Sequence, residues 1–331
     1  MHVGEIGEVE LIWQIRSLVD KFQKKALVGI GDDTAVIKGK GNHLFLFTTD
    51  TLVEDIHFKW RFISAYQLGW KALAVNISDI AAMGGYPTFA LVTLGLPPRT
   101  LLSTVEDIYR GMQDLSLKMD VEIVGGDIVR SPIFFITISL LGEVEDQRII
   151  LRSGAKPGDR IYITGDIGAA ATGFICLNKK EISLKPESRE FLEKRHLMPF
   201  PRLKEAREIS RKKIATAMID TSDGLSSDLY HILEESNVGA EIWEDKFPVA
   251  SQTKEVLSRL NRSFSEVALA GGEDYELLFT AVPDKNVEEI LNFQVTMIGK
   301  IIEEKGLWLV NKEGERKRIK PGGWDHFSKK I

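Results

Sequence analysis

The chain has 331 residues, of which 44% are hydrophobic and 27% charged, and its formal net charge is −5 at pH 7. This composition is typical of a globular protein long enough for two domains, and it lacks the concentrated basic face of a nucleic-acid-binding protein. A single cysteine, Cys176, excludes an intramolecular disulfide. The first residues show no signal-peptide pattern, and no apolar run approaches the ~20 residues that span a bilayer. We therefore expect a soluble, cytoplasmic protein that binds neither nucleic acid nor membrane.

Helices and strands alternate in the first half. A helix is predicted to begin at Ser64, where Gln67 completes a capping box, and to end at the glycine pair 84–85. This helix is apolar on most of its circumference, so we expect it to be buried. Ser103 is the expected N-cap of a later helix. The remaining elements of this half are expected over 9–22, 44–48, 89–96, 103–118, 121–124 and 133–144.

The pattern breaks over 152–159, where two glycines and a proline indicate a domain boundary. Two α/β domains, residues 1–150 and residues 151–331, are therefore predicted. The basic run 316–320 is interpreted as a solvated strand or turn edge. Helices of the second half are expected over 169–177, 204–210 and 225–235, and strands over 160–164, 216–219, 275–282, 295–300 and 307–310.

Acidic residues stand beside glycine, serine or threonine at several places, most of them at predicted strand ends. They are Asp32, Asp33, Asp50, Asp127, Asp220, Asp223, Glu273 and Asp274, joined by Asp79 on the buried helix. A single such loop is more often a turn or a helix cap. The set as a whole favours a site, and Asp79 adds weight because a charge on an apolar helix needs a partner or a cation.

If these carboxylates converge, their mutual repulsion has to be offset, and a divalent cation does this directly. Oxygen ligands without cysteine or histidine at zinc spacing select a hard cation such as magnesium. The P-loop pattern, the dinucleotide-binding pattern, the protein-kinase motifs and the G-x-S-x-G elbow are all absent. Carboxylate-held metal beside glycine-rich backbone is what phosphoryl transfer requires, so the residues favour a phosphotransferase without a P-loop.

Longer motifs follow one another over nearly the whole chain. They are 28–33 (VGIGDD), 49–53 (TDTLV), 57–58 (HF), 71–84 (KALAVNISDIAAMG), 125–127 (GGD), 152–159 (RSGAKPGD), 219–228 (IDTSDGLSSD), 271–277 (GGEDYEL) and 324–327 (WDHF). In these motifs the chain resembles the thiamine-monophosphate kinase family. Motifs of this length and order are far more specific than a lone glycine-rich loop.

The resemblance implies a fold and a reaction. The fold is the two-domain α/β (α+β type) fold of the aminoimidazole-ribonucleotide synthetase superfamily, in which the N-terminal domains of two subunits pair into a β-barrel in a homodimer. The implied reaction is the magnesium-dependent, in-line transfer of the ATP γ-phosphoryl group to thiamine phosphate, which gives thiamine diphosphate and ADP. Several Mg²⁺ ions and ATP are the implied cofactor and co-substrate.

The resemblance also assigns residues, motif by motif. The implied metal-binding residues are Asp33, Thr48, Thr49, Asp50, Asp79, Asp127, Asp220 and Asp223. The implied ATP contacts are Tyr109, Gly126, Asp127, Arg152 and Ser222, and those to thiamine phosphate are His57, Glu273 and Trp324. No residue is implied as a covalent nucleophile or a general base.

Simpler interpretations of single residues stay open at this stage. His57 read alone is a packed structural histidine, Trp324 closes a C-terminal hairpin, and Arg152 forms a surface ion pair. The glycine pair 271–272 serves only the backbone geometry before a strand. Asp55 departs from the family, which often has glycine before the histidine, so the shape of the loop that holds His57 stays open.

Three other functions are considered. An aminoimidazole-ribonucleotide synthetase shares the acidic strand ends but lacks the sequence motif found here at 71–84. A selenophosphate synthetase carries a reactive cysteine or selenocysteine near its N-terminus, and Cys176 lies too far along the chain. A non-catalytic nucleotide-binding partner protein, like the hydrogenase-maturation relatives, uses a terminal cysteine that is missing from 327–331.

Overall fold

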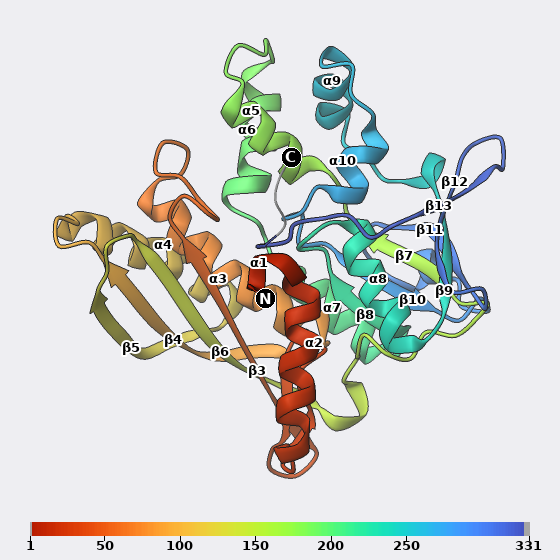
Figure 1. Ribbon diagram of the computed structural model, residues 1–331, viewed down its shortest axis with the longest axis horizontal. Coiled ribbons are helices and arrows are strands. Elements are labelled where there is room, and N and C mark those ends of the chain that lie inside the picture. Colours follow the sequence, from red (N-terminus) through yellow and green to blue (C-terminus); the bar gives the residue numbers. More distant parts are fainter. Residues whose placement is uncertain (1, 328–331) are drawn as a thin grey trace.

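The computed structural model describes residues 2–327. Two sheets share the chain, one on each side of a central helix (Figure 1). The first sheet has the strand order β1-β2-β3-β6-β4-β5, and only β4 and β5 run parallel. Its strands are β1 (Ala26–Val28), β2 (Ala35–Lys38), β3 (His43–Val53), β4 (Tyr86–Leu96), β5 (Glu122–Arg130) and β6 (Phe135–Glu145).

The second sheet draws all its strands from the later part of the chain. Its order is β13-β12-β9-β11-β7-β10-β8, and only β12 and β9 run parallel. Its strands are β7 (Arg160–Thr164), β8 (Ala215–Asp220), β9 (Gly239–Trp243), β10 (Leu277–Ala281), β11 (Val295–Ile302), β12 (Gly306–Val310) and β13 (Arg316–Ile319). The basic run at 316–320 is thus an edge strand over most of its length, as interpreted from the sequence.

The helices cover these sheets. They are α1 (Val3–Ile6), α2 (Glu8–Val19), α3 (Ala65–Ala82), α4 (Leu102–Met119), α5 (Ala169–Asn178), α6 (Pro186–Leu197), α7 (Leu203–Arg211), α8 (Leu225–Ser236), α9 (Ser251–Arg259), α10 (Phe264–Ala270) and α11 (Val287–Ile290). Short 3₁₀ turns follow α2, β6 and β9 (Asp20–Phe22, Asp146–Arg148 and Glu244–Lys246). Among the described helices, none is long and apolar enough to cross a membrane.

Helix α3 is the centre of the molecule. Ser64 accepts the main-chain N–H of Gln67, and the Gln67 side chain accepts the N–H of Ser64, so the predicted capping box is present. The helix packs on β3, β4 and β6 of the first sheet and also on β8 and α7 of the second half (Figure 1). Because it is covered from both sides, its apolar residues are buried around most of the circumference.

The first sheet has one covered face and one open face. Along β3, Leu44, Leu46 and Leu52 point to α3 and are buried, whereas Phe47 points the other way and is 44% exposed. On β4, Phe89 and Leu91 of the same outer face are 43% and 50% exposed. The sheet therefore presents apolar side chains on a face that no described element covers.

Several predictions about individual elements were wrong. Helix α4 begins at Leu102, and its N-cap Leu101 makes no side-chain capping bond, so Ser103 is not the cap. Strand β5 continues through Gly125 and Gly126, and Asp127 is therefore inside a strand. Asp50 is likewise inside β3, which is longer than predicted because it pairs with β6 over its full length. Helices α6, α9 and α10 and strand β9 were not predicted, since their short or charged sequences carry little apolar periodicity.

Candidate active site

Three carboxylates from distant parts of the chain meet beside α3. Ligand oxygens of Asp33, Asp79 and Asp220 all lie within 4.8 Å of one another. Asp33 lies in the turn before β2, Asp79 in the last turn of α3, and Asp220 is the last residue of β8. The first and second halves of the chain thus both contribute to one acidic cluster.

Neighbouring polar groups fix the orientation of these carboxylates. The Thr48 hydroxyl donates to Asp79 at 2.5 Å, and the Ser78 hydroxyl donates to Asp220 at 2.5 Å. Asp50 lies two residues from Thr48 on the same face of β3 and is close enough to Asp79 to interact with it. Hydroxyl groups of β3 and α3 therefore hold the carboxylates of Asp79 and Asp220 in place.

Without a bound cation, burial and mutual repulsion oppose full ionisation of the carboxyl groups in and beside the cluster. Burial away from water and, next, the nearby Asp33 carboxylate together raise the pKa of Asp220 to about 7. Burial also raises the pKa of Asp79 well above its usual range, with Asp50 and Asp220 adding to the rise. The pKa of Asp32 is raised to about 7, first by burial and then by Asp33. A positive charge among these groups would remove the repulsion.

The donor set fits a hard divalent cation. Every member of the cluster offers carboxylate oxygen, and no histidine or cysteine of the described residues belongs to it. The Oδ2 atom of Asp33 is buried and has no hydrogen-bond partner among residues 2–327. An ionised oxygen in that position needs a cation, and Mg²⁺ or a similar ion prefers oxygen ligands.

Arg152 is part of the cluster rather than a surface residue. Its Nη2 and Nε atoms donate to Asp33 Oδ1 at 2.6 and 3.1 Å, and its main-chain N–H donates to Asp32 at 3.2 Å. Burial by itself would lower the pKa of Arg152, but the carboxylates of Asp33, Asp32 and Asp220 together raise it above its ordinary value. A permanently charged guanidinium therefore lies beside the carboxylates, where it can meet an anionic ligand.

Two loops of the second half join at the edge of this cluster. The Glu273 N–H donates to the Ser222 carbonyl at 2.7 Å. A Cβ at Gly272 would lie 2.3 Å from the same carbonyl, so the close approach of the loops requires glycine there. Asp223 lies in the first loop, and burial raises its pKa to about 6, with Glu8 adding to the effect.

Glu273 is bound by two basic residues. Lys71 Nζ lies 2.6 Å from one carboxylate oxygen, and His196 Nδ1 lies 2.9 Å from the other. The Lys71 side chain is only 1% exposed, while that of Glu273 is 29% exposed. Burial would raise the pKa of Glu273, but Lys71 and then His196 hold it well below its usual range. Glu273 is therefore an ionised acceptor that solvent, and so a ligand, can still reach.

Aromatic side chains collect next to Glu273. The His57 ring lies 4.9 Å from the His326 ring, and Trp324 lies edge-on to His326 at 5.7 Å. His57 Nδ1 accepts the Val53 N–H at 3.0 Å, so its Nε2 atom carries the proton of the neutral ring. Burial, and then His326, lowers the pKa of His57 to about 4. The main-chain N–H of Trp324 donates to the Asp223 carbonyl at 3.2 Å, which places the C-terminal segment beside the acidic loop.

The loop that holds His57 has a strained position. Asp55 has φ +64°, in the left-handed region that glycine adopts most easily. Its N–H donates to the Phe58 carbonyl at 2.8 Å, which keeps the turn closed. Glycine would adopt this backbone without strain, and the turn stays closed with Asp55 in its place.

Within this chain, four of the predicted site residues lie away from the carboxylate cluster. The Thr49 side chain is on the outer face of the first sheet, where it hydrogen-bonds to Ser139 at 3.1 Å. Gly126 and Asp127 lie on β5, three strands from β3 in the sheet order, so about 14 Å separates these strands. Tyr109 lies on α4, which packs against α3, and its ring joins the edge of the apolar core.

Sequence reasoning did not assign three residues that the structure places at the site. Lys71 and His326 stood inside quoted motifs, but nothing in the motifs said that Lys71 is buried against Glu273. His196 lies on α6, which was not predicted. The only early signal was a lysine on an otherwise apolar helix, which is the same signal that made Asp79 conspicuous.

The fold and this site define a class of protein. Residues 31–144 match the family model "AIR synthase related protein, N-terminal domain", and residues 156–310 match "AIR synthase related protein, C-terminal domain". The chain therefore belongs to the AIR synthase-related family. Its two-domain α/β fold is the fold expected from the sequence.

Sequence relatives and solved structures identify the group within this family to which the chain belongs. The chain is 37% identical to the thiamine-monophosphate kinase of Bacillus subtilis over 91% of this chain and 93% of that one, and 36% identical to that of Aquifex aeolicus over 99% and 100%. It superimposes on the solved structure of AaThiL complexed with AMPPCP and TMP with a TM-score of 0.88, at 35% identity over 98% and 99% of the two chains. The chain is a member of the thiamine-monophosphate kinases, a family of enzymes. The solved HypE–HypF complex, at 19% identity, shares the fold alone.

Proposed function

We propose that this protein transfers the γ-phosphoryl group of ATP to thiamine phosphate and releases thiamine diphosphate and ADP. The convergence of Asp33, Asp79 and Asp220, in a chain of this family, carries the proposal. An oxygen of the thiamine phosphate attacks the γ-phosphorus in line as the bond to the β–γ bridging oxygen breaks. The second pKa of a phosphate monoester is near ~6, so the nucleophile is already ionised and needs no general base.

The difficulty in this reaction is to bring two polyanions together. We propose that Mg²⁺ ions are held by the carboxylates of the cluster, by Asp50 and Asp223, and by Thr48. When bound, magnesium neutralises charge on the transferred phosphoryl group. Arg152 supplies a fixed positive charge beside the same position, and both substrates can approach without losing their ionised form.

We assign the substrate side to the groups around Glu273. Thiamine carries a cationic thiazolium ring, which an ionised carboxylate and aromatic rings attract. Glu273, His57 and Trp324 lie together and provide these groups. We assign ATP to Ser222 and Arg152 beside the cluster. Tyr109, Gly126, Asp127 and Thr49 lie away from the cluster within one chain, so their roles as ATP contacts and, for Asp127 and Thr49, as metal ligands stay predictions from the resemblance.

We also propose a homodimer and a division into domains of residues 1–150 and residues 151–331. The outer face of the first sheet carries Phe47, Phe89 and Leu91, which are each more than 40% exposed. Burying this face against the same face of a second copy would remove apolar surface from water and protect the edge of β5.

The reaction is tested by following thiamine diphosphate and ADP by chromatography in mixtures of protein, ATP, magnesium and thiamine phosphate. Parallel reactions replace thiamine phosphate by free thiamine, omit magnesium, or use Asp79→Asn or the exposed control Asp120→Asn. We expect equal amounts of thiamine diphosphate and ADP from the wild type and from the control. Both products should be lost without metal and in the Asp79 variant.

Other outcomes would favour other functions. ADP without thiamine diphosphate would keep an ATP-dependent enzyme of this superfamily but contradict the substrate assignment, and an aminoimidazole-ribonucleotide synthetase-like reaction would be examined next. No ADP under any condition would contradict the kinase proposal and favour a nucleotide-binding partner protein.

A further inference from the structure

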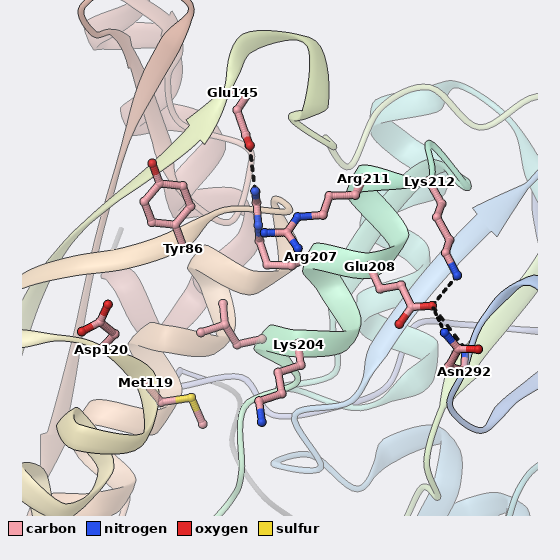
Figure 2. A pocket seen from close by; sticks show the side chains of 11 residues that line it. Tyr86, Met119, Asp120, Glu145, Lys204, Arg207, Glu208, Arg211, Lys212 and Asn292 are labelled. Carbon is pink, nitrogen blue, oxygen red and sulfur yellow. Dashed lines mark hydrogen bonds and ion pairs between the residues drawn. The ribbon is translucent and has the colours of Figure 1, made fainter.

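A cavity of about 740 Å³ opens between the two halves of the molecule, and no residue of the carboxylate cluster lines it (Figure 2). Tyr86 of β4, Met119 at the end of α4 and Glu145 at the end of β6 form one wall. Successive turns of α7 form the other wall. Its size is in the range of small-molecule sites in proteins, which measure about 300–1,000 Å³.

Basic residues of α7 share the side of the helix that faces this cavity. Lys204, Arg207 and Arg211 are three and four residues apart, a spacing that places them on one face of a helix. Figure 2 shows the Arg211 side chain extending toward Arg207. Two planar guanidinium groups are therefore presented together at the wall of the cavity.

Arg207 is fixed in its position before any ligand arrives. Its Nη2 atom donates to both carboxylate oxygens of Glu145 at 2.9 Å, and its Nη1 atom donates to the Gly84 carbonyl at 2.6 Å. Gly84 follows the C-terminus of α3. A side chain held in this way loses little conformational entropy when it contacts a ligand.

Of the other positive charges of the cavity, only one is balanced by a carboxylate. Lys212 is paired with Glu208 at 2.6 Å. Lys204 and Arg211, in contrast, form no ion pair and no side-chain hydrogen bond within residues 2–327, although both line the cavity. The one lining carboxylate outside the two ion pairs is Asp120. Two uncompensated cations thus face a single carboxylate, in a chain whose net charge is −5.

We propose that this cavity is a second ligand site, which binds a small organic phosphate. Phosphate matches the unpaired guanidinium of Arg211, which can donate two parallel hydrogen bonds to its oxygens, with the Lys204 ammonium as a second positive charge on the same helix face. Met119 and Leu203 line the same cavity and offer apolar contact to the organic part. The site is independent of the proposed kinase reaction and uses none of its residues.

The test uses calorimetric titration of the full-length protein with AMP in the presence of EDTA. Without metal, the acidic cluster repels phosphate, so phosphate-dependent binding reports other sites. The test variant is Lys204→Gln/Arg211→Gln, which leaves no partner among the described residues unpaired, and we expect it to melt at the wild-type temperature. The matched control is Arg259→Gln, which removes an exposed arginine of α9 whose side chain pairs with Glu255.

We expect AMP to bind the wild type and the control equally, and the double variant at least about tenfold more weakly. Inorganic phosphate should bind the same site more weakly than AMP, because it makes no contact with Met119 or Leu203. Failure of AMP to bind the wild type, or equal binding by the double variant, would overturn the proposal. Inorganic phosphate binding as tightly as AMP would show a bare anion site and would overturn the organic-phosphate assignment.

Discussion

Replacement of Lys71 by methionine tests the ion pair that holds Glu273. The substitution keeps the length and shape of the side chain but removes the ammonium group 2.6 Å from the carboxylate. Breaking a fully buried pair costs about 3–5 kcal/mol. Glu273 is 29% exposed and keeps His196 as a neighbour, so water and the imidazole offset part of the loss. We therefore expect the free energy of unfolding to fall by about 2–3 kcal/mol at pH 7.

The pH dependence of this loss follows from the sign of the pKa shift. The pKa of Glu273 is depressed in the folded protein, so the pair stabilises fully above the unfolded value of about 4.3. This contribution disappears as the pH falls through the lower folded value. The difference between wild type and Lys71→Met should therefore be largest at neutral pH and shrink below pH ~4.

Urea unfolding followed by circular dichroism measures these differences. Lys118→Met, an exposed lysine of α4, is the control and should change little. In a double-mutant cycle, Glu273→Gln should remove much of the cost of Lys71→Met, because no carboxylate is then left unpaired. A cost that stays the same in the Glu273→Gln background, or no loss of stability at neutral pH, would refute the ion pair as described.

Three further predictions concern the metal, the His57 loop and the proposed dimer. The folded pKa of Asp220 is raised to about 7, so the metal-free protein should lose stability as the pH rises from about 4 to 7. Asp220→Asn should reduce this loss of stability. The same variant should abolish the rise in melting temperature that magnesium causes. Asp55→Gly should be more stable than Asp55→Ala by about 1 kcal/mol in chemical denaturation, since only glycine adopts φ +64° without strain. Leu91→Glu should give a monomer in light scattering, whereas Leu117→Glu, on 78%-exposed surface of α4, should not; a dimer that survives Leu91→Glu would contradict the proposed interface.

Local sequence determined a large part of this protein. The capping box at Ser64 and the nearly continuous apolar surface after it predicted α3 and its burial, because both signals lie within one helix. The acidic residues at strand ends and loops were visible for the same reason, and Asp33, Asp79 and Asp220 do meet. The family motifs, which extend over nearly the whole chain, predicted the fold class.

Only the tertiary structure decided which of these residues meet, and on which face of the sheet they lie. The alternation of side chains along β3 turns Thr48 toward Asp79 and Thr49 away from it, although the two residues are adjacent in sequence. The order of strands in the sheet places Asp127 on β5, three strands from β3. Lys71 pairs with Glu273 across 202 positions of the chain, and no local pattern encodes a contact between residues so far apart. The buried carboxylates come together because apolar packing around α3 brings both sheets to it, and that packing is a property of the whole chain.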